Sequence, residues 1–273
     1  MIFGKSSSSS PSSSKVSGFL SGLKDGSAFQ LQLKDRVRAG KVLAMVLKTI
    51  VRRKKDEMLV VLGIPRGGVI VADIVAEKLN ADYFDIVIPR KLRAPDNKEN
   101  AIGAIAPDGS TVYLDEFMVS SLKVPADYIE KEKEEQREEI KRRIGLYRRC
   151  YSSSDSMSPQ HPSNDTEEDY PNIQGKTTVL LIDDGIATGA TVIAAARWLR
   201  AKYKSAKLII AAPVASKQAI EVIKKERVAD IVETVTTPAN FVSVSQFYKD
   251  FDQATDEKVV EITNKWKMSK RRR

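Results

Sequence analysis

The chain has 273 residues, 42% of them hydrophobic, and 45 Lys and Arg side chains against 36 Asp and Glu, which gives a net charge of +9. This length allows one large or two modest domains with a buried core. One Cys (Cys150) and one His (His161) exclude a disulfide framework, a cysteine-based zinc cluster and a His-dependent triad, so chemistry must depend on carboxylates, Lys and Arg, hydroxyls and backbone amides.

The first segment, residues 1–27, is rich in Ser, and we expect it to be disordered because it has too few apolar side chains to bury. It lacks the apolar region of a secretory signal, and a transit peptide is the less favoured alternative because no Arg precedes Arg36. No later stretch reaches the roughly 18 consecutive apolar residues that a membrane span needs. We therefore expect a cytoplasmic protein without membrane contact.

Residues 28–262 contain alternating strand and helix patterns, which we interpret as one domain. Such alternation predicts a doubly wound α/β fold with a mainly parallel sheet. Ligands bind these sheets outside the carboxyl ends of the strands, so the loops directly after strands are the candidate sites. The predicted elements are strands over Met58–Gly63, Phe84–Ile88, Thr178–Ile182, Leu208–Pro213 and Ile231–Val235, a hairpin of Ala101–Ala106 with Thr111–Leu114, and helices over Val69–Leu79, Pro125–Arg149, Ala190–Tyr203 and Lys217–Lys225.

A second polar segment, residues 151–173, interrupts this domain. It is rich in Ser, carries an acidic patch and contains almost nothing apolar. Burial could not offset the entropy of ordering it, so we interpret it as a linker or surface insertion.

The segment Val179–Thr191 carries the strongest functional signal. Four apolar residues predict a strand that ends in two adjacent carboxylates, Asp183 and Asp184. A loop with two Gly and two Thr residues leads into a helix, whose first N–H groups and positive dipole end suit a phosphate. The carboxylates would repel a phosphate, but as acceptors they suit a vicinal diol and attract Mg²⁺. The sequence therefore predicts a sugar phosphate with free hydroxyls as the ligand.

The less favoured alternative for this segment is an Asp-rich turn in which Thr caps the next helix. The segment is not a P-loop, because no Lys-Ser or Lys-Thr follows the last Gly, and it lacks the Gly-x-Gly-x-x-Gly dinucleotide pattern.

These thirteen residues resemble the signature of the type I phosphoribosyltransferases, enzymes that use 5-phosphoribosyl 1-diphosphate (PRPP). The resemblance covers roughly residues 29–262 apart from the insertion, and it is strongest to a poorly characterised microbial branch. It implies that Asp183 and Asp184 bind the ribose hydroxyls as catalytic residues, with Mg²⁺ at Asp183 either directly or through water. It further implies that the 5-phosphate is bound by Ala187, Thr188, Gly189, Ala190 and Thr191.

Two other loops fit this resemblance. Pro65-Arg66-Gly67-Gly68 stands where the family has a loop that grips the diphosphate, which implies that Arg66, Gly67 and Gly68 bind PRPP. Residues 90–97 stand where the family has a mobile loop that closes over PRPP, which implies that Lys91 or Arg93 adds positive charge as a catalytic residue. A plain turn and ordinary surface charges are the respective alternatives.

The resemblance implies a Mg²⁺-dependent glycosyltransferase (a pentosyltransferase) of nucleotide metabolism that displaces diphosphate from C1 of PRPP. The acceptor is an unidentified nucleobase or amine. In the purine-salvage members an Asp of the phosphate loop lies near the incoming base, and Ala187 stands there instead, which argues against hypoxanthine or guanine. We expect a small hood over residues 29–48 and 237–260 to recognise the acceptor, and a homodimer is left open. The aromatic residues Phe241, Phe247, Tyr248 and Phe251 would stack on a base or, as we favour, pack within the fold.

The chain ends in what we interpret as a basic tail, residues 263–273, because six of the nine excess positive charges lie in Lys265–Arg273. A solvated tail is the favoured interpretation, and binding of RNA or DNA through counterion release is the alternative. Two alternatives to catalysis follow: a regulatory PRPP- or nucleotide-sensing protein that uses the tail, and a degenerate relative that binds a phosphosugar without transfer. The intact loop after residue 90 favours the enzyme.

Overall fold

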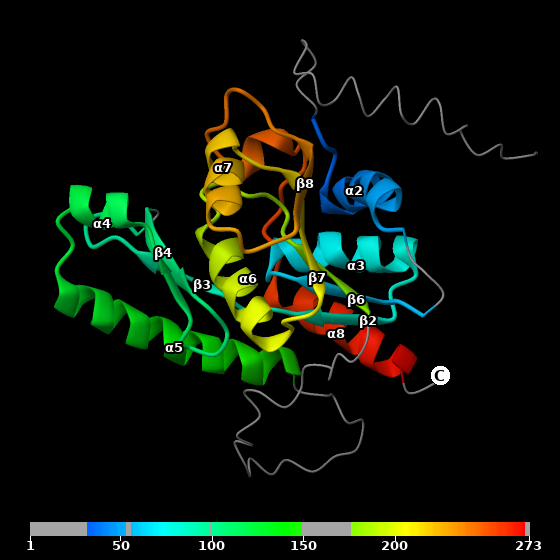
Figure 1. Ribbon diagram of the computed structural model, residues 1–273, viewed down its shortest axis with the longest axis horizontal. Helices are drawn as coiled ribbons and strands as arrows, with labels where there is room; N and C mark the ends of the chain where they lie inside the picture. Colours follow the sequence, from blue (N-terminus) through cyan, green and yellow to red (C-terminus); the bar gives the residue numbers. More distant parts are fainter. Residues whose placement is uncertain (1–31, 53–55, 99, 149–175, 271–273) are drawn as a thin grey trace, which may run out of the picture.

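The computed structural model describes residues 32–52, 56–98, 100–148 and 176–270 (Figure 1). The predicted Ser-rich start and the predicted insertion at 151–173 lie outside these residues, as do Cys150 and His161. Within the described residues, no helix is both long and apolar enough to span a membrane.

The centre of the molecule is a sheet of five parallel strands in the order β2-β1-β6-β7-β8 (Figure 1). The three inner strands are nearly continuous buried runs, because a parallel sheet in this class of fold is covered on both faces. The order reverses between β1 and β6, which makes this pair the switch point where ligands of doubly wound folds bind. The strands are β1 (Met58–Gly63), β2 (Tyr83–Ile86), β6 (Thr177–Ile182), β7 (Lys207–Val214) and β8 (Ile231–Thr236).

Helices cover both faces of this sheet, so the predicted α/β fold is confirmed (Figure 1). Along β6, Leu180 and Ile182 face one helical layer, while Val179 and Leu181 face the other, as the two-residue repeat of a strand requires. The first layer holds α2 (Arg36–Ile50), α3 (Gly67–Leu79) and α8 (Asp256–Lys270), and the second holds α6 (Ala190–Lys202) and α7 (Lys217–Lys225).

A small antiparallel sheet stands beside α6 (Figure 1). It contains the predicted hairpin and adds a strand where the sequence indicated a mobile loop. The long charged helix packs beneath it and continues to α8, and Tyr147 near the end of that helix is buried in the central core. The elements are β3 (Arg90–Arg93), β4 (Ala101–Ile105), β5 (Val112–Leu114), α4 (Glu116–Ser121) and α5 (Ala126–Arg148).

Residues 241–252, here called the hood segment, include the short 3-10 helix η1 (Val244–Phe247) and pair with the residues before α2. Its aromatic rings pack on one another: Phe241 contacts Phe247, and Tyr248 contacts Phe251, with centroids 5.3 and 5.1 Å apart. In this structure these rings therefore pack within the fold, which was the favoured of the two expectations.

The end of the described chain differs from the predicted tail. Residues 263–270 belong to α8, where Trp266 stacks on Phe84 with centroids 5.1 Å apart. The Lys265 ammonium contacts the carboxylates of Asp73 and Glu77 on α3. The count of positive charges hid the helical repeat of Val259, Ile262 and Trp266, which packs against the core.

Candidate functional site

Two predicted loops meet at the switch point. The register of the parallel strands places Gly63, the last residue of β1, beside Ile182, the last residue of β6. The ladder continues one step further, because the Ile64 amide donates to the Ile182 carbonyl at 2.9 Å. The loops that follow both strands therefore start side by side, and Asp183 lies against the turn at Gly67-Gly68.

Glycine is required in this turn because the two loops touch. A Cβ atom on Gly68 would lie 2.8 Å from Asp183 Cα and 2.9 Å from the Ile182 carbonyl oxygen. A Cβ atom on Gly67 would fall within the Asp184 carboxylate. Only backbone without a side chain allows this approach, so the Arg66-Gly67-Gly68 turn and the carboxylates form one site.

The two adjacent carboxylates differ in their surroundings. Asp183 is half-buried, and its Oδ1 accepts from the Asp184 amide at 2.8 Å. Burial, reinforced by the neighbouring Asp184 carboxylate, holds the pKa of Asp183 well above its usual range, while the positive charge of Lys91 opposes the shift. A cation beside Asp183 would therefore favour the charged form.

Asp184 is held from two further directions. Its Oδ2 accepts from Arg36 Nε at 2.7 Å, and its backbone carbonyl accepts from the Tyr248 hydroxyl at 2.6 Å.

Sequence reasoning did not single out Arg36. The available signal was its position, since Arg36 shares the buried face of α2 with Ala39, Leu43 and Leu47, and an arginine in an apolar stripe needs a partner.

The predicted phosphate loop opens at the N-terminus of α6. Gly189 takes a positive φ of 84° as the N-cap, a conformation that favours glycine, and the helix then starts at Ala190. The loop is anchored beneath, because Ser216 Oγ donates to the Ala187 carbonyl at 2.6 Å, while Thr188 is exposed. The exposed Thr188 hydroxyl accepts from the Ala190 amide at 3.5 Å, so this hydroxyl lies at the helix N-terminus, where the dipole favours an anion.

Lys91 and Arg93 take different positions. Lys91 is exposed on β3 and acts electrostatically on Asp183. Arg93, the last residue of β3, turns its side chain toward α5, where its Nε donates to Glu132 Oε1 at 2.9 Å. The register between β3 and β4 shifts between Leu92 and Arg93, so strand pairing becomes irregular at Arg93.

Arg66 points from the Gly-rich turn toward α8. Its Nη1 lies 3.7 Å from Asp256 Oδ1, and the same carboxylate oxygen accepts from the Tyr147 hydroxyl at 2.5 Å. Tyr147 and Asp256 were not singled out from the sequence, because α5 and α8 are joined to this turn only in the folded chain.

Comparison with known proteins agrees with this geometry. The sequence profile of the phosphoribosyl transferase domain matches residues 30–252. The chain belongs to the phosphoribosyl transferase family. Two strain versions of a Mycobacterium tuberculosis protein named "Putative phosphoribosyl transferase" are each 34% identical over 226 residues, 83% of this chain and 45% of theirs. The chain thus spans about half the length of these curated relatives.

A solved structure shares the fold. The crystal structure of TT1426 from Thermus thermophilus is similar with a TM-score of 0.60 and 33% sequence identity, over 86% of this chain and 99% of that chain. The chain therefore carries a phosphoribosyl transferase domain with the doubly wound fold of the type I enzymes, and its family is one of transferases.

This phosphoribosyl transferase domain offers few protein ligands to a metal ion. Among the described residues, no three His, Cys, Asp or Glu side chains come together as a metal cluster. Asp183 and Asp184 are a pair of hard oxygen donors, and Mg²⁺ is commonly held by one or two carboxylates together with substrate phosphates and water. The donor set therefore fits Mg²⁺ that arrives with a phosphorylated substrate.

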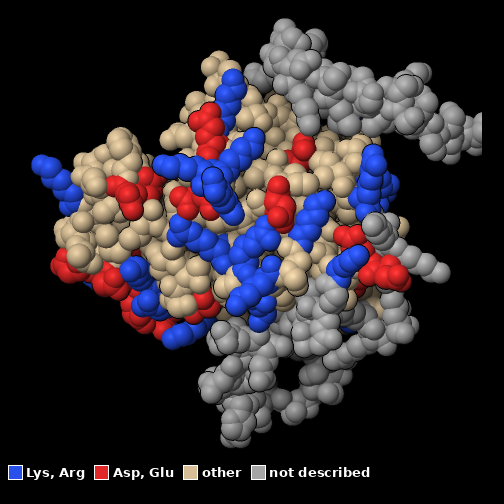
Figure 2. Space-filling view, in the orientation of Figure 1, with Lys and Arg blue, Asp and Glu red and all other residues tan. Residues whose placement is uncertain are grey.

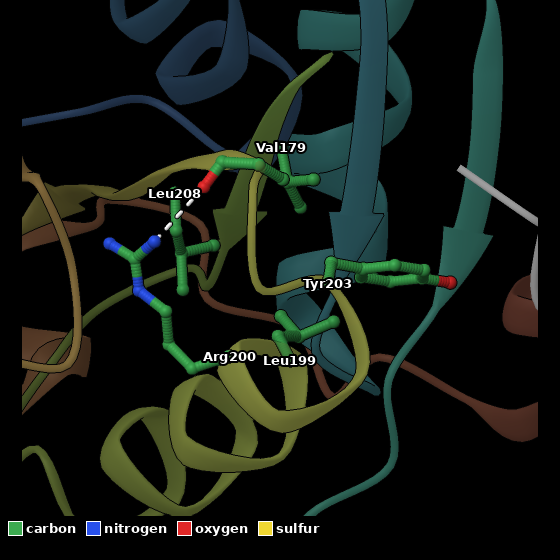
Figure 3. A pocket seen from close by; sticks show the side chains of 6 residues that line it. Val179, Leu199, Arg200, Tyr203 and Leu208 are labelled. Carbon is green, nitrogen blue, oxygen red and sulfur yellow. Dashed lines mark hydrogen bonds between the residues drawn. The ribbon is translucent and has the colours of Figure 1, made fainter. Parts of the chain in front are cut away.

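A small hollow elsewhere in the phosphoribosyl transferase domain does not suit a phosphosugar. It lies near the beginnings of β6 and β7, away from the loops that follow these strands, and Arg200 beside it donates to the Ala206 carbonyl at 2.9 Å (Figure 3). Lys and Arg side chains gather over α6 in Figure 2, and there Arg200 pairs with Asp230, and Arg197 with Glu226. The hollow is lined by Val179, Leu199, Arg200, Tyr203, Ala206 and Leu208.

Proposed function

We propose that this protein is a Mg²⁺-dependent phosphoribosyltransferase that transfers the phosphoribosyl group of PRPP to a nucleobase or amine. The observation that carries the proposal is the meeting of three features at one switch point: the Asp183–Asp184 pair, the Arg66-Gly67-Gly68 turn, and the N-terminus of α6. They match the diol, the diphosphate and the 5-phosphate of one substrate. A cytoplasmic location and a role in nucleotide metabolism are part of this proposal.

In the proposed reaction, an acceptor lone pair forms a bond to C1 of the ribose while the bond from C1 to the diphosphate oxygen breaks. The electron pair of the broken bond leaves with the diphosphate, and the proton that the acceptor loses passes to solvent. Positive charge grows on the sugar and negative charge on the leaving group. Groups aimed at that developing charge therefore lower the barrier.

This chain's residues divide these tasks. Asp184 and Asp183 accept hydrogen bonds from the ribose hydroxyls. These bonds fix the sugar and so orient its C1 atom for the reaction. Arg66 and the amides of Gly67 and Gly68 bind the diphosphate, and the Thr188–Thr191 segment binds the 5-phosphate. Mg²⁺ held by Asp183 and substrate oxygens would neutralise charge on the diphosphate.

We propose that Lys91, rather than Arg93, is the residue of the small antiparallel sheet that supplies positive charge to the ligand site. It is exposed and acts on Asp183, whereas Arg93 pairs with Glu132 and contacts Glu135 on α5. A lysine ammonium near the carboxylates and the diphosphate would strengthen ligand binding. It would also stabilise the negative charge that develops on the leaving diphosphate.

The decisive experiment is a calorimetric titration of the purified protein with PRPP, with Mg²⁺ and then with EDTA, using ribose 5-phosphate as the control. Mg²⁺-dependent binding that is tighter for PRPP supports the proposal, and a screen of nucleobases and amines for diphosphate release then seeks the acceptor. Absence of PRPP binding by folded protein would refute it. Tight binding without release by any acceptor would favour a PRPP sensor instead.

A further inference from the structure

Arg36 joins the hood segment to a carboxylate of the site. Asp35 accepts from the Arg38 amide at 2.7 Å and so caps α2, which begins at Arg36. The Arg36 side chain donates Nε to Asp184 Oδ2 at 2.7 Å and Nη1 to the Asp252 carbonyl at 2.6 Å. Arg36 is only 9% exposed, so both contacts form with little competition from water.

An aromatic ring fixes the plane of this guanidinium. The Cζ atom of Arg36 lies 3.9 Å from the centroid of the Phe251 ring and 6.0 Å from that of Tyr248. A guanidinium stacks on an aromatic face and forms directed hydrogen bonds at the same time, whereas a lysine ammonium does not. The orientation of Arg36 is therefore set before any ligand binds.

The two chain segments that carry this arrangement are hydrogen-bonded to each other. The Leu33 amide donates to the Phe247 carbonyl at 2.8 Å, and the Lys249 amide donates to the Leu33 carbonyl at 2.7 Å. The start of α2 and the hood segment thus form one unit, which reaches Asp184 through Arg36 and through the Tyr248 hydroxyl.

The Asp184 carboxylate consequently has a restricted position. Arg36 donates to Asp184 Oδ2, and Gly67 packs against the same oxygen. The carboxylate of the preceding residue, Asp183, is also adjacent. Two adjacent carboxylates repel each other, and the Arg36 charge opposes that repulsion. An ionised carboxylate has about four lone-pair positions, so the bond to Arg36 leaves acceptor capacity for sugar hydroxyls.

We propose that Arg36 is a positioning residue for ribose recognition, which holds the Asp184 carboxylate in the orientation that accepts the ribose hydroxyls. This inference rests on the proposed function, because it assigns a role within the same ligand site. Arg36 donates its hydrogen bond to Asp184 and only packs against Gly67, whereas the diphosphate is assigned to Arg66 and the amides of the turn. Loss of Arg36 should therefore weaken ligands that contain ribose and spare a ligand that contains only the diphosphate.

The test compares Arg36→Met, Arg36→Lys and wild type by calorimetry with three probes: PRPP, ribose 5-phosphate and inorganic pyrophosphate, each with Mg²⁺. Arg36→Met should lower the affinity for PRPP and for ribose 5-phosphate by about tenfold or more, which is the effect of losing one charge-assisted hydrogen bond. Pyrophosphate affinity should change by less than about threefold, a difference under about 0.7 kcal/mol. Arg36→Lys should recover part of the ribose-dependent affinity, because an ammonium keeps the charge without the stacked fork.

Arg38→Met is the matched control, because Arg38 is exposed on the same first turn of α2. It should bind all three probes like wild type. An Asp184→Asn background adds a second check: Arg36→Met should weaken ribose 5-phosphate little further there, because the group that Arg36 positions has lost its charge. The conservative Arg36→Lys variant keeps the test available if the Met variant does not fold.

The outcomes separate the two proposals. Equal weakening of pyrophosphate and ribose 5-phosphate in a folded Arg36→Met variant, or weakening of neither, would overturn the positioning role while leaving PRPP binding by wild type intact. Failure of wild type itself to bind PRPP would overturn the proposed function and, with it, the role of Arg36.

Discussion

Arg66 is paired with Asp256, the first residue of α8, across a distance of 3.7 Å between Nη1 and Oδ1. The arginine that we propose for the diphosphate thus has an internal carboxylate partner. Both side chains are partly exposed, at 32% and 23%, so the pair is weak enough to be exchanged for a ligand. The Tyr147 hydroxyl holds the same Asp256 oxygen and thereby ties the end of α5 to this turn.

Asp256→Asn should strengthen pyrophosphate binding about two- to fivefold, the range for a partly exposed ion pair of about 0.4–1 kcal/mol. The amide removes a competing charge, and its oxygen still accepts from Tyr147. Calorimetry with Mg²⁺-pyrophosphate measures this, and Asp250→Asn, which changes an exposed carboxylate of the hood segment, is the control. Weaker binding in Asp256→Asn would mean that Asp256 orients Arg66 for the ligand.

Gly68→Ala should destabilise the protein by about 1–3 kcal/mol, because the new methyl group meets Asp183 Cα at 2.8 Å and cannot move into open space. Pyrophosphate affinity should fall with it as the turn shifts away from the carboxylates. Gly145→Ala in α5 is the matched control: its Cβ would have nothing within 4 Å, so the helix should gain about 0.5–1 kcal/mol. Urea unfolding and calorimetry decide, and a Gly68→Ala variant as stable as wild type would contradict the close approach.

The core of the site could be predicted from sequence because its signals are local. A buried strand, two carboxylates and a Gly- and Thr-containing loop occupy consecutive residues 179–191, and the strand before Arg66 carries an equally short signal. Strand order then follows from the rules of doubly wound sheets, which bring both loops to one edge.

Contacts between distant segments gave no such signal. Arg36 and Asp184 are 148 residues apart, and their pairing depends on how the hood segment packs on α2. Arg93 and Glu132 are 39 residues apart, and their pairing depends on how α5 packs on β3. The last helix was hidden for a different reason: six of the nine residues 265–273 are Lys or Arg, and this run of charge masks the helical repeat to which Val259 and Trp266 belong.

Lys91→Gln should lower the rate of diphosphate release from PRPP on the order of 10²-fold, as the loss of one group aimed at developing charge does. Lys91 is exposed, so stability should stay near that of wild type. The rate is measured with the acceptor that the nucleobase and amine screen identifies, and the stability of Lys91→Gln is measured by urea unfolding.

Arg93→Gln is the counterpart of Lys91→Gln and should behave in the opposite way. It removes donors from Glu132, which is 4% exposed, and should cost about 1–3 kcal/mol of stability. Its effect on the rate should be smaller than that of Lys91→Gln. A larger rate loss in a stable Arg93→Gln variant would move the catalytic role to Arg93.

Glu139 on α5 should make stability depend on pH. Acidic and basic side chains lie side by side along this helix (Figure 2), and hydrogen bonds from Arg142, together with Arg143, lower the pKa of Glu139 to about 2. Because the unfolded value is about 4.3, this stabilisation is fully present above about pH 5 and is lost as the pH falls through the folded value. Glu139→Gln should therefore cost about 0.5–1 kcal/mol at pH 7, the range for two partly exposed helix ion pairs, and the deficit should shrink between pH 5 and about pH 2. Urea unfolding at several pH values measures this, with Glu138→Gln as the control, because Glu138 and Lys141 form an exposed pair that should contribute little. A deficit that stays constant down to the lowest pH would show that packing, and not the charge of Glu139, supplies the stability.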